Sequence, residues 1–328
     1  MKPTPGDVHV NTPLSNISVA EIQSMDGFVA DKVFPNIPVS MQSDRYYTYD
    51  RGYLNRDEMQ VRAPGAESAG GDYAVDNTPT YFAQVYAFHH DIDDQRRANE
   101  DSVLDADREA VLICNLKAMI KREKLWASKY FTTSVWTTDK QGVNSGPTGT
   151  QFLQWDDAAS TPIEDLRAAI TAQKLLTGIK PNTIVMGAQV FDALIDHPDI
   201  VDRVKYGQTP GSPATIETSD LAAILKIPRI FVMEAVENTA AEGATYSGAF
   251  IGGKSLLLCH AAPSPGKMIP TAGYTFSWNG YLGASSMGGR IKKFRLERNA
   301  ADRIEMEMAF DQKLVTADMG TYFYTAVA

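Results

Sequence analysis

Residues 248–255 read GAFIGGKS, which fits the phosphate-binding pattern GxxxxGK[ST] letter for letter. That chemistry needs a buried strand before the loop and a helix after it, because backbone N–H groups and the helix N-terminus must meet the phosphates. Here the preceding residues NTAAEGATYS are loop-like, and residues 256–260 favour a strand. The string therefore predicts a strand, a turn and a second strand, with a P-loop ATPase as a remote alternative.

A second group, His89, His90 and Asp91 followed by Asp93 and Asp94, could supply ligands to a transition metal. In a strand, however, neighbouring side chains point to opposite faces. No second ligand cluster is evident in the sequence, and no GxSxG nucleophile elbow occurs. We predict no metal, no cofactor and no catalytic residues, hence a protein that is not an enzyme.

The one dense basic run is Arg290, Lys292, Lys293, Arg295 and Arg298. Such a run could contact DNA or a scaffold protein, but strand alternation divides these charges between two faces, and acidic residues lie nearby. The net charge of −9 provides no basic field for gripping phosphates, so any DNA is contained rather than clamped. We therefore predict ion pairs with a neighbouring subunit, carried by Arg290, Lys293 and Arg295.

Residues 40–86 hold half of the tyrosines and fold about a glycine-rich tip at residues 64–71. No helical period runs through them, and the flanks mix aromatic with charged residues, which predicts a long hairpin. Because an isolated two-stranded ribbon is marginally stable in water, we expect this arm to lie on a neighbouring subunit. The candidate contact residues are Tyr46, Tyr47, Tyr49, Tyr53, Arg56, Arg62, Glu67 and Tyr73.

The remaining patterns predict the elements that carry the arm. A long helix is expected over residues 102–130, and a short amphipathic docking segment over residues 17–33. Strict alternation over residues 304–310 predicts a long half-buried strand that packs on the helix. The predicted apolar stripe of the helix is Leu112, Leu116, Met119, Trp126 and Tyr130.

Residues 160–269 alternate helical and strand-like patterns and are expected to form one compact α/β unit. With 328 residues and 44% hydrophobic residues, the chain can bury a sizeable core. Cys114 and Cys259 are far apart in sequence and are predicted to be buried free thiols. No apolar stretch is long enough for a membrane span or a signal peptide, which predicts a soluble protein made in the cytosol.

In this order, the elements resemble the major capsid proteins of tailed bacteriophages, which have the Hong Kong 97-like fold. The resemblance covers almost the whole chain. The strings that carry it are SDRYYTYDRG, QVRAPGAESAGG, KYFTTSVW, FLQWDDAASTPIEDLRAAI, PNTIVMGAQVFDAL, AAPSPGKMIPTAGYTFSW and AADRIEMEMAFDQKLVTADMG.

The resemblance implies an α+β fold with an N-terminal arm at residues 1–36 and an extended hairpin at residues 37–88. It further implies a peripheral domain at residues 89–159 and 270–328, containing the spine helix, and an axial domain at residues 160–269. Copies of the chain would form the hexamers and pentamers of an icosahedral virion shell around packaged double-stranded DNA.

The implied partners are a portal protein and, as possibilities, a separate scaffold and a decoration or cement protein, with no membrane. One departure concerns a crosslink that some members form through a hairpin lysine. This chain has no lysine between Val33 and Leu116, so that nucleophile is missing. A non-viral, encapsulin-like shell protein is the alternative reading.

Overall fold

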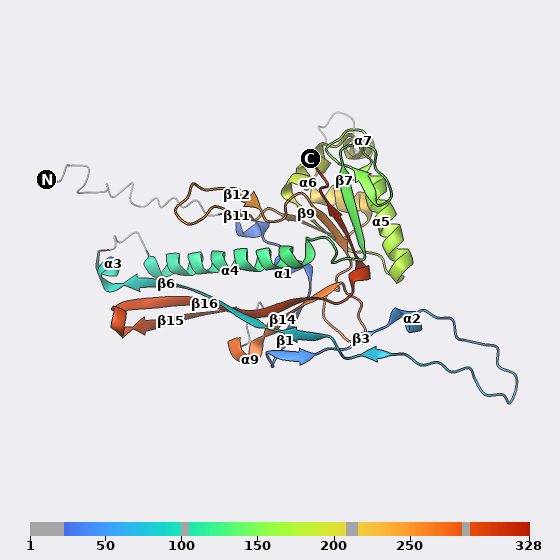
Figure 1. Ribbon diagram of the computed structural model, residues 1–328, viewed down its shortest axis with the longest axis horizontal. Helices are drawn as coiled ribbons and strands as arrows, with labels where there is room; N and C mark the ends of the chain where they lie inside the picture. Colours follow the sequence, from blue (N-terminus) through green and yellow to red (C-terminus); the bar gives the residue numbers. More distant parts are fainter. Residues whose placement is uncertain (1–22, 100–104, 208–215, 284–288) are drawn as a thin grey trace.

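The computed structural model describes residues 23–99, 105–207, 216–283 and 289–328. In Figure 1, a long sheet and a long helix lie side by side as an extended body. A compact α/β unit stands on one end of this body, and a hairpin arm projects beyond that end. The predicted α+β fold class is confirmed.

Strand β16 is the centre of the extended body and pairs with three other strands. β6 and β15 run antiparallel to its first part, β14 runs antiparallel to its last part, and β1 adds in parallel to β14. The bounds are β1 (Asn36–Val39), β6 (Gln84–Asp93), β14 (Gly273–Trp278), β15 (Gly289–Leu296) and β16 (Ala301–Leu314).

Helix α4 (Ala106–Tyr130) is the predicted spine helix, and it covers one face of this sheet. It begins at Ala106 because the Asp105 carboxylate accepts a hydrogen bond from the Arg108 backbone N–H. The predicted start at residue 102 is therefore too early, and residues 100–104 lie outside the described chain. The predicted packing of the closing strand on the helix is confirmed, since Ile304 and Met308 lie in clusters with α4.

The predicted apolar stripe of α4 is only half correct. The side against the sheet carries small residues, Ala110, Cys114 and Ala118, which let the helix lie close to the strands. At 100° per residue, Leu112 and Leu116 lie on the opposite side, and Leu112 is 40% exposed. By contrast, Trp126 and Tyr130 are buried where α4 meets the α/β unit.

The α/β unit contains a six-stranded sheet in the order β10-β9-β13-β17-β7-β8. Its main core cluster joins the sheet to the helices through side chains such as Trp155, Leu194 and Phe323. The strands are β7 (Thr138–Val143), β8 (Gln151–Leu153), β9 (Thr183–Gly187), β10 (Arg229–Met233), β13 (Leu256–Cys259) and β17 (Gly320–Tyr324). The helices are α5 (Pro162–Thr177), α6 (Ala188–Asp196), α7 (Pro198–Gly207) and α8 (Thr218–Leu225).

Three of these strands come from outside the α/β region expected at residues 160–269. β7 and β8 precede it, and β17 follows it. The physical reason is the burial of β13 on both faces: it needs a partner on each edge, and β17 supplies the second. The sheet therefore includes strands that precede and follow residues 160–269 in the sequence.

The expected docking segment at residues 17–33 is not one continuous helix. Residues 17–22 lie outside the described chain, and the rest forms a turn, η1 (Met25–Gly27), and a short helix, α1 (Ala30–Val33). A Cβ on Gly27 would lie 3.0 Å from the Glu234 side chain, so the turn runs tightly along the α/β unit. The segment does dock, because Val33 and Phe34 are buried with Trp126 and Tyr130.

The short elements complete the described chain. Those of the hairpin arm are β2 (Ser43–Arg45), β3 (Thr48–Tyr49), α2 (Arg51–Leu54), β4 (Val75–Asp76) and β5 (Thr80–Phe82). The others are α3 (Asp94–Ala98), β11 (Val236–Asn238), β12 (Gly248–Phe250), α9 (Asn279–Leu282), η2 (Glu297–Asn299) and η3 (Ala317–Met319).

Candidate assembly surfaces

The hairpin arm has little structure of its own. β2 pairs with β5 and β3 with β4, and both ladders are only two or three residues long. Beyond them, residues 55–74 contain no strand or helix, and Figure 1 shows this part extending away from the rest of the subunit. Met59 and Val61 at this end are 92% and 103% exposed, so apolar surface is left without cover in the single chain.

The candidate contact residues on the arm divide into two groups. Tyr46 packs on Phe276 of the sheet with ring centroids 5.5 Å apart, so it belongs to the root of the arm. The rest are on the arm itself: Tyr47 is 69% exposed, Tyr49 lies beside Tyr73, and the Arg56 guanidinium lies over the Tyr53 ring. Arg62 and Glu67 are exposed near the tip. Their contact with a neighbouring subunit stays a prediction.

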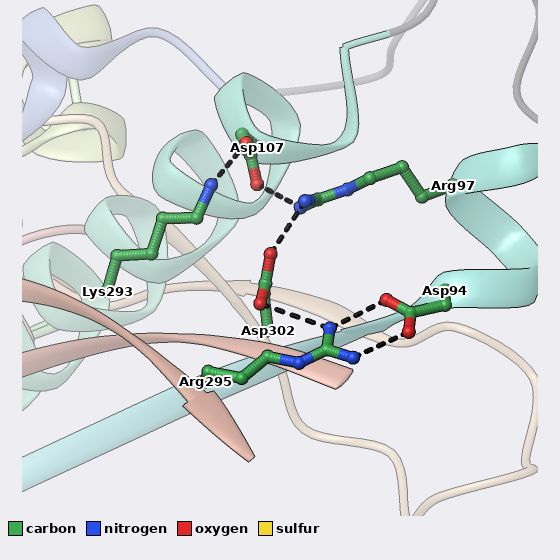
Figure 2. A network of polar contacts seen from close by, with 6 residues as sticks. All are labelled: Asp94, Arg97, Asp107, Lys293, Arg295 and Asp302. Atoms are coloured by element: carbon green, nitrogen blue, oxygen red, sulfur yellow. Dashed lines mark hydrogen bonds and ion pairs between the residues drawn. The ribbon is translucent and has the colours of Figure 1, made fainter. Parts of the chain in front are cut away.

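The basic candidates on β15 are paired within the subunit. Figure 2 shows a network that joins α3, the first turn of α4, β15 and β16. Lys293 Nζ lies 2.6 Å from the Asp107 carboxylate, and Arg295 donates both terminal nitrogens to Asp94 at 2.6 Å. Arg97 bridges Asp107 and Asp302 at 2.8 and 2.6 Å.

This network contains three carboxylates and three cations, so its charges balance. The hydrogen bonds from Arg295 hold the pKa of the Asp94 carboxyl below its ordinary value. On the other face of the sheet, Arg290 and Lys292 both pair with Glu307 at 2.8 and 2.7 Å. The role of Arg290, Lys293 and Arg295 across a subunit boundary stays a prediction, and the arm is the better supported contact.

A buried carboxylate that sequence reasoning missed attaches the N-terminal segment to α4. Glu123 is 1% exposed and accepts hydrogen bonds from the backbone N–H groups of Val29 and Ala30. Without Glu123, these N–H groups at the start of α1 would have no hydrogen-bond acceptor within the helix. A signal was present in the sequence, since Glu123 interrupts the apolar positions between Met119 and Trp126.

Glu123 makes this attachment depend on pH. Burial raises the pKa of its carboxyl from 4.5 to about 7, and the nearby Asp31 carboxylate raises it further. The backbone N–H bonds and Lys32 act in the opposite direction but are outweighed. Because the folded pKa lies above the unfolded one, the contribution to stability is full below about 4.5 and is lost as the pH rises through about 7.

We expect the unfolding free energy of the wild-type chain, relative to Glu123→Gln, to fall between pH 5 and pH 7. The slope should be at most about 1.4 kcal/mol per pH unit, the value for one proton. Denaturant titrations at several pH values measure it, with Glu67→Gln on the exposed arm as the charge control. A difference between wild type and Glu123→Gln that stays constant with pH would contradict the assignment.

The phosphate-binding string forms no phosphate site. β12, a turn and β13 follow one another, so the predicted strand, turn and strand are confirmed. A Cβ on Gly187 would lie 1.9 Å from the Gly253 carbonyl oxygen, which shows that β9 fills the space beside the loop. The Lys254 ammonium contacts the Ala328 carbonyl oxygen.

Replacing Lys254 with alanine is therefore expected to leave particle yield unchanged and to remove no ATP binding. Isothermal titration of the wild-type chain with ATP and magnesium should give no heat of binding. Stoichiometric ATP binding that disappears in Lys254→Ala would restore the P-loop reading.

The histidines of the described chain do not gather at one site. His89 and His90 pair with Glu305 and Ile304 on opposite faces of β6. His197 is buried: its Nδ1 accepts from the Asp199 backbone N–H, and its Nε2 lies 3.0 Å from Ser160 Oγ. With Nδ1 accepting, Nε2 carries the proton and cannot take one from the serine. Among the described residues, no three metal-ligating side chains gather, and no helix there is long and apolar enough to cross a bilayer.

Comparisons with known proteins agree with this description. A family model described as phage major capsid protein E matches residues 151–272. The chain is 23% identical over 313 residues to the major capsid protein of Pseudomonas phage JBD67, and the match covers 92% of each. It has the fold of the capsid of cyanophage P-SCSP1u, with a TM-score of 0.59, 10% identity, and 94% and 91% of the two chains covered.

A non-viral shell protein has the same fold. The match to the SrpI encapsulin of Synechococcus elongatus has a TM-score of 0.55 and 13% identity, and covers 95% and 92% of the two chains. At such identities the solved structures show the fold alone, whereas the family model and the phage relative are both similarities to phage capsid proteins. The chain is similar to a phage major capsid protein over almost its whole length and has the Hong Kong 97-like fold of phage capsids.

Proposed function

We propose that copies of this chain assemble into a closed icosahedral shell that encloses packaged double-stranded DNA. The observation that carries the proposal is the arm: residues 55–74 have no secondary structure and expose apolar side chains such as Met59 and Val61. Such a segment gains stability only on another molecule, and a second copy of the chain is the partner that a homomeric shell provides.

The contained DNA needs no dedicated binding site. The chain carries a net charge of −9, and Lys293 and Arg295 of the basic run are neutralised by carboxylates of the same subunit. Sequence-independent binding to DNA rests on unpaired cations that can replace counterions. The shell is therefore proposed to hold its DNA by enclosure, and the chain has a structural rather than a catalytic role.

The proposal also assigns a place in the shell to each part of the subunit. α4 and the β16 sheet form the peripheral domain, and the sheet of β9, β13 and β17 with its helices forms the axial domain around the five-fold and six-fold positions. Residues 37–88 hold the hairpin that reaches a neighbour. Of the N-terminal arm, residues 1–36, the first 22 lie outside the described chain, and Val33 and Phe34 are buried on their own subunit. Assembly takes place in the host cytoplasm, with a portal protein and a separate scaffold or cement protein as partners.

An encapsulin-like compartment is the second candidate, favoured by the fold match alone. Electron microscopy of native particles purified from the host cell, combined with nuclease treatment, separates the two. Icosahedral particles from the infected host that hold nuclease-resistant double-stranded DNA support the capsid. Icosahedra filled with protein cargo would favour the compartment, and the absence of particles would refute both.

The missing lysines give a further expectation for the mature shell. Without a hairpin nucleophile, subunits must be held by non-covalent overlap, typically about 2,000 Å² or more per obligate pair. Mature particles boiled in detergent should therefore run as one band near the 35.9 kDa chain mass. A ladder of covalent oligomers that survives reducing agent would show a crosslink made by other residues.

A further inference from the structure

The contacts within the arm cannot by themselves fix its orientation relative to the rest of the subunit. Its two ladders contain few paired residues, and so short a two-stranded ribbon is not stable by itself. The tip near Gly65 lies about 40 Å along the chain from Arg51, at roughly 1.5 Å per residue within α2 and roughly 3.3 Å per residue beyond it. A tilt of about 10° at the root would move the tip by about 7 Å, which exceeds the 4 to 4.5 Å reach of an apolar contact.

The returning limb of the arm is held by one buried carboxylate. Asp311 Oδ2 accepts a hydrogen bond from the Phe82 backbone N–H at 3.0 Å. Its other oxygen lies 2.8 Å from Lys129 Nζ, which also donates to the Gln312 carbonyl. One side chain therefore ties β5 of the arm to the end of α4 and to β16.

The outgoing limb is held by a second carboxylate. Arg51, at the start of α2, lies 2.6 Å from Asp318 Oδ2 in η3. The other oxygen of Asp318 accepts from Thr137 Oγ1 at 2.5 Å. Asp311 and Asp318 lie seven residues apart on the same closing segment of the chain. The segment 311–318 therefore contacts both limbs of the arm at its root.

Aromatic packing fixes the root between these two points. Tyr81 stacks on Phe276 with ring centroids 4.6 Å apart and an interplanar angle of 9°. Beyond Arg51 on the outgoing limb, the contacts of residues 55–74 are made with residues of the arm itself, as between Tyr49 and Tyr73. The two aspartates are therefore placed where a small change has the largest effect on the tip.

We propose that Asp311 and Asp318 are positioning residues that set the angle of the arm and, through it, the curvature of the assembled shell. This inference rests on the proposed function, because the angle matters only if the arm bridges subunits. The Arg51–Asp318 pair is the adjustable element, since both side chains are partly exposed. Asp311 is the fixed element, since it is buried.

The test compares particle diameters by cryo-electron microscopy. Asp318→Asn and Arg51→Gln should give folded subunits with an unchanged unfolding midpoint, while the fraction of closed shells of wild-type diameter falls at least fivefold. The exchanged pair, Arg51→Asp with Asp318→Arg, should restore that fraction. Arg203→Gln, which breaks a pair of similar exposure with Glu164 in the α/β unit, is the matched control and should change nothing.

A second measurement addresses Asp311 without requiring assembly. Hydrogen exchange at the Phe82 amide should be at least tenfold faster in Asp311→Asn than in wild type, and unchanged in Asp318→Asn. Single variants that make shells of wild-type diameter, or an exchanged pair that does not rescue them, would overturn the inference while leaving the proposed function intact. If the wild-type chain formed no shells, the proposed function itself would fail.

Discussion

Removing residues 60–74 is expected to abolish closed shells and to leave a soluble, folded subunit. The deleted residues lie in no core cluster, and β4, which starts at Val75, keeps its pairing with β3. The subunit should therefore unfold at the wild-type midpoint. Shell closure should fall below detection, because Val61 and the other exposed side chains of the tip would no longer cover a neighbour.

The control replaces the same residues with a glycine and serine linker of equal length. This linker keeps the reach of the arm but removes its side chains, so it should also fail to close shells. Electron microscopy and size-exclusion chromatography measure both variants. Normal particles from the deletion would show that residues 60–74 are not an assembly contact.

The second large effect is expected in the fold itself, at Trp126. Its side chain is fully buried, with Tyr130 and Phe131 rings 5.2 and 5.3 Å away and Phe34 of the N-terminal segment 6.0 Å away. Trp126→Ala leaves a cavity where α4 meets the α/β unit. We expect a loss of about 3 to 5 kcal/mol in the free energy of unfolding.

Leu116→Ala is the matched control on the same helix. Leu116 lies on the side of α4 away from the sheet, and alanine favours a helix slightly more than leucine does. The loss should therefore be about 1 kcal/mol or less. Urea unfolding followed by tryptophan fluorescence and circular dichroism measures both. Equal losses in the two variants would mean that the outward side of α4 is buried in the isolated subunit.

Sequence periodicity could predict the long elements because each one carries its own pattern. The alternation of Ile304, Met306, Met308 and Phe310 predicts which face of β16 meets the helix, and the structure confirms it. The same reasoning misread α4. The prediction assigns the large apolar residues to the buried face of the helix. In the structure, the helix face that packs closely on the sheet carries Ala110, Cys114 and Ala118.

The polar contacts could not be predicted, because they join residues that are distant in the sequence. Lys293 and Asp107 meet only because β15 and α4 share one end of the sheet. Asp311 looks like an ordinary polar position in an alternating strand, and nothing local links it to Phe82. For the same reason the place of β17 in the α/β sheet could not be predicted, since it depends on pairing with β13, about 65 residues earlier in the chain.

The most direct test of the account is a cryo-electron microscopy map of the assembled particle at side-chain resolution. The account predicts that residues 55–74 of each subunit lie on an adjacent subunit, with Met59 and Val61 covered and the Arg51–Asp318 pair intact at the root. A closed shell in which these residues fold back on their own subunit, or project into solvent without contact, would contradict it.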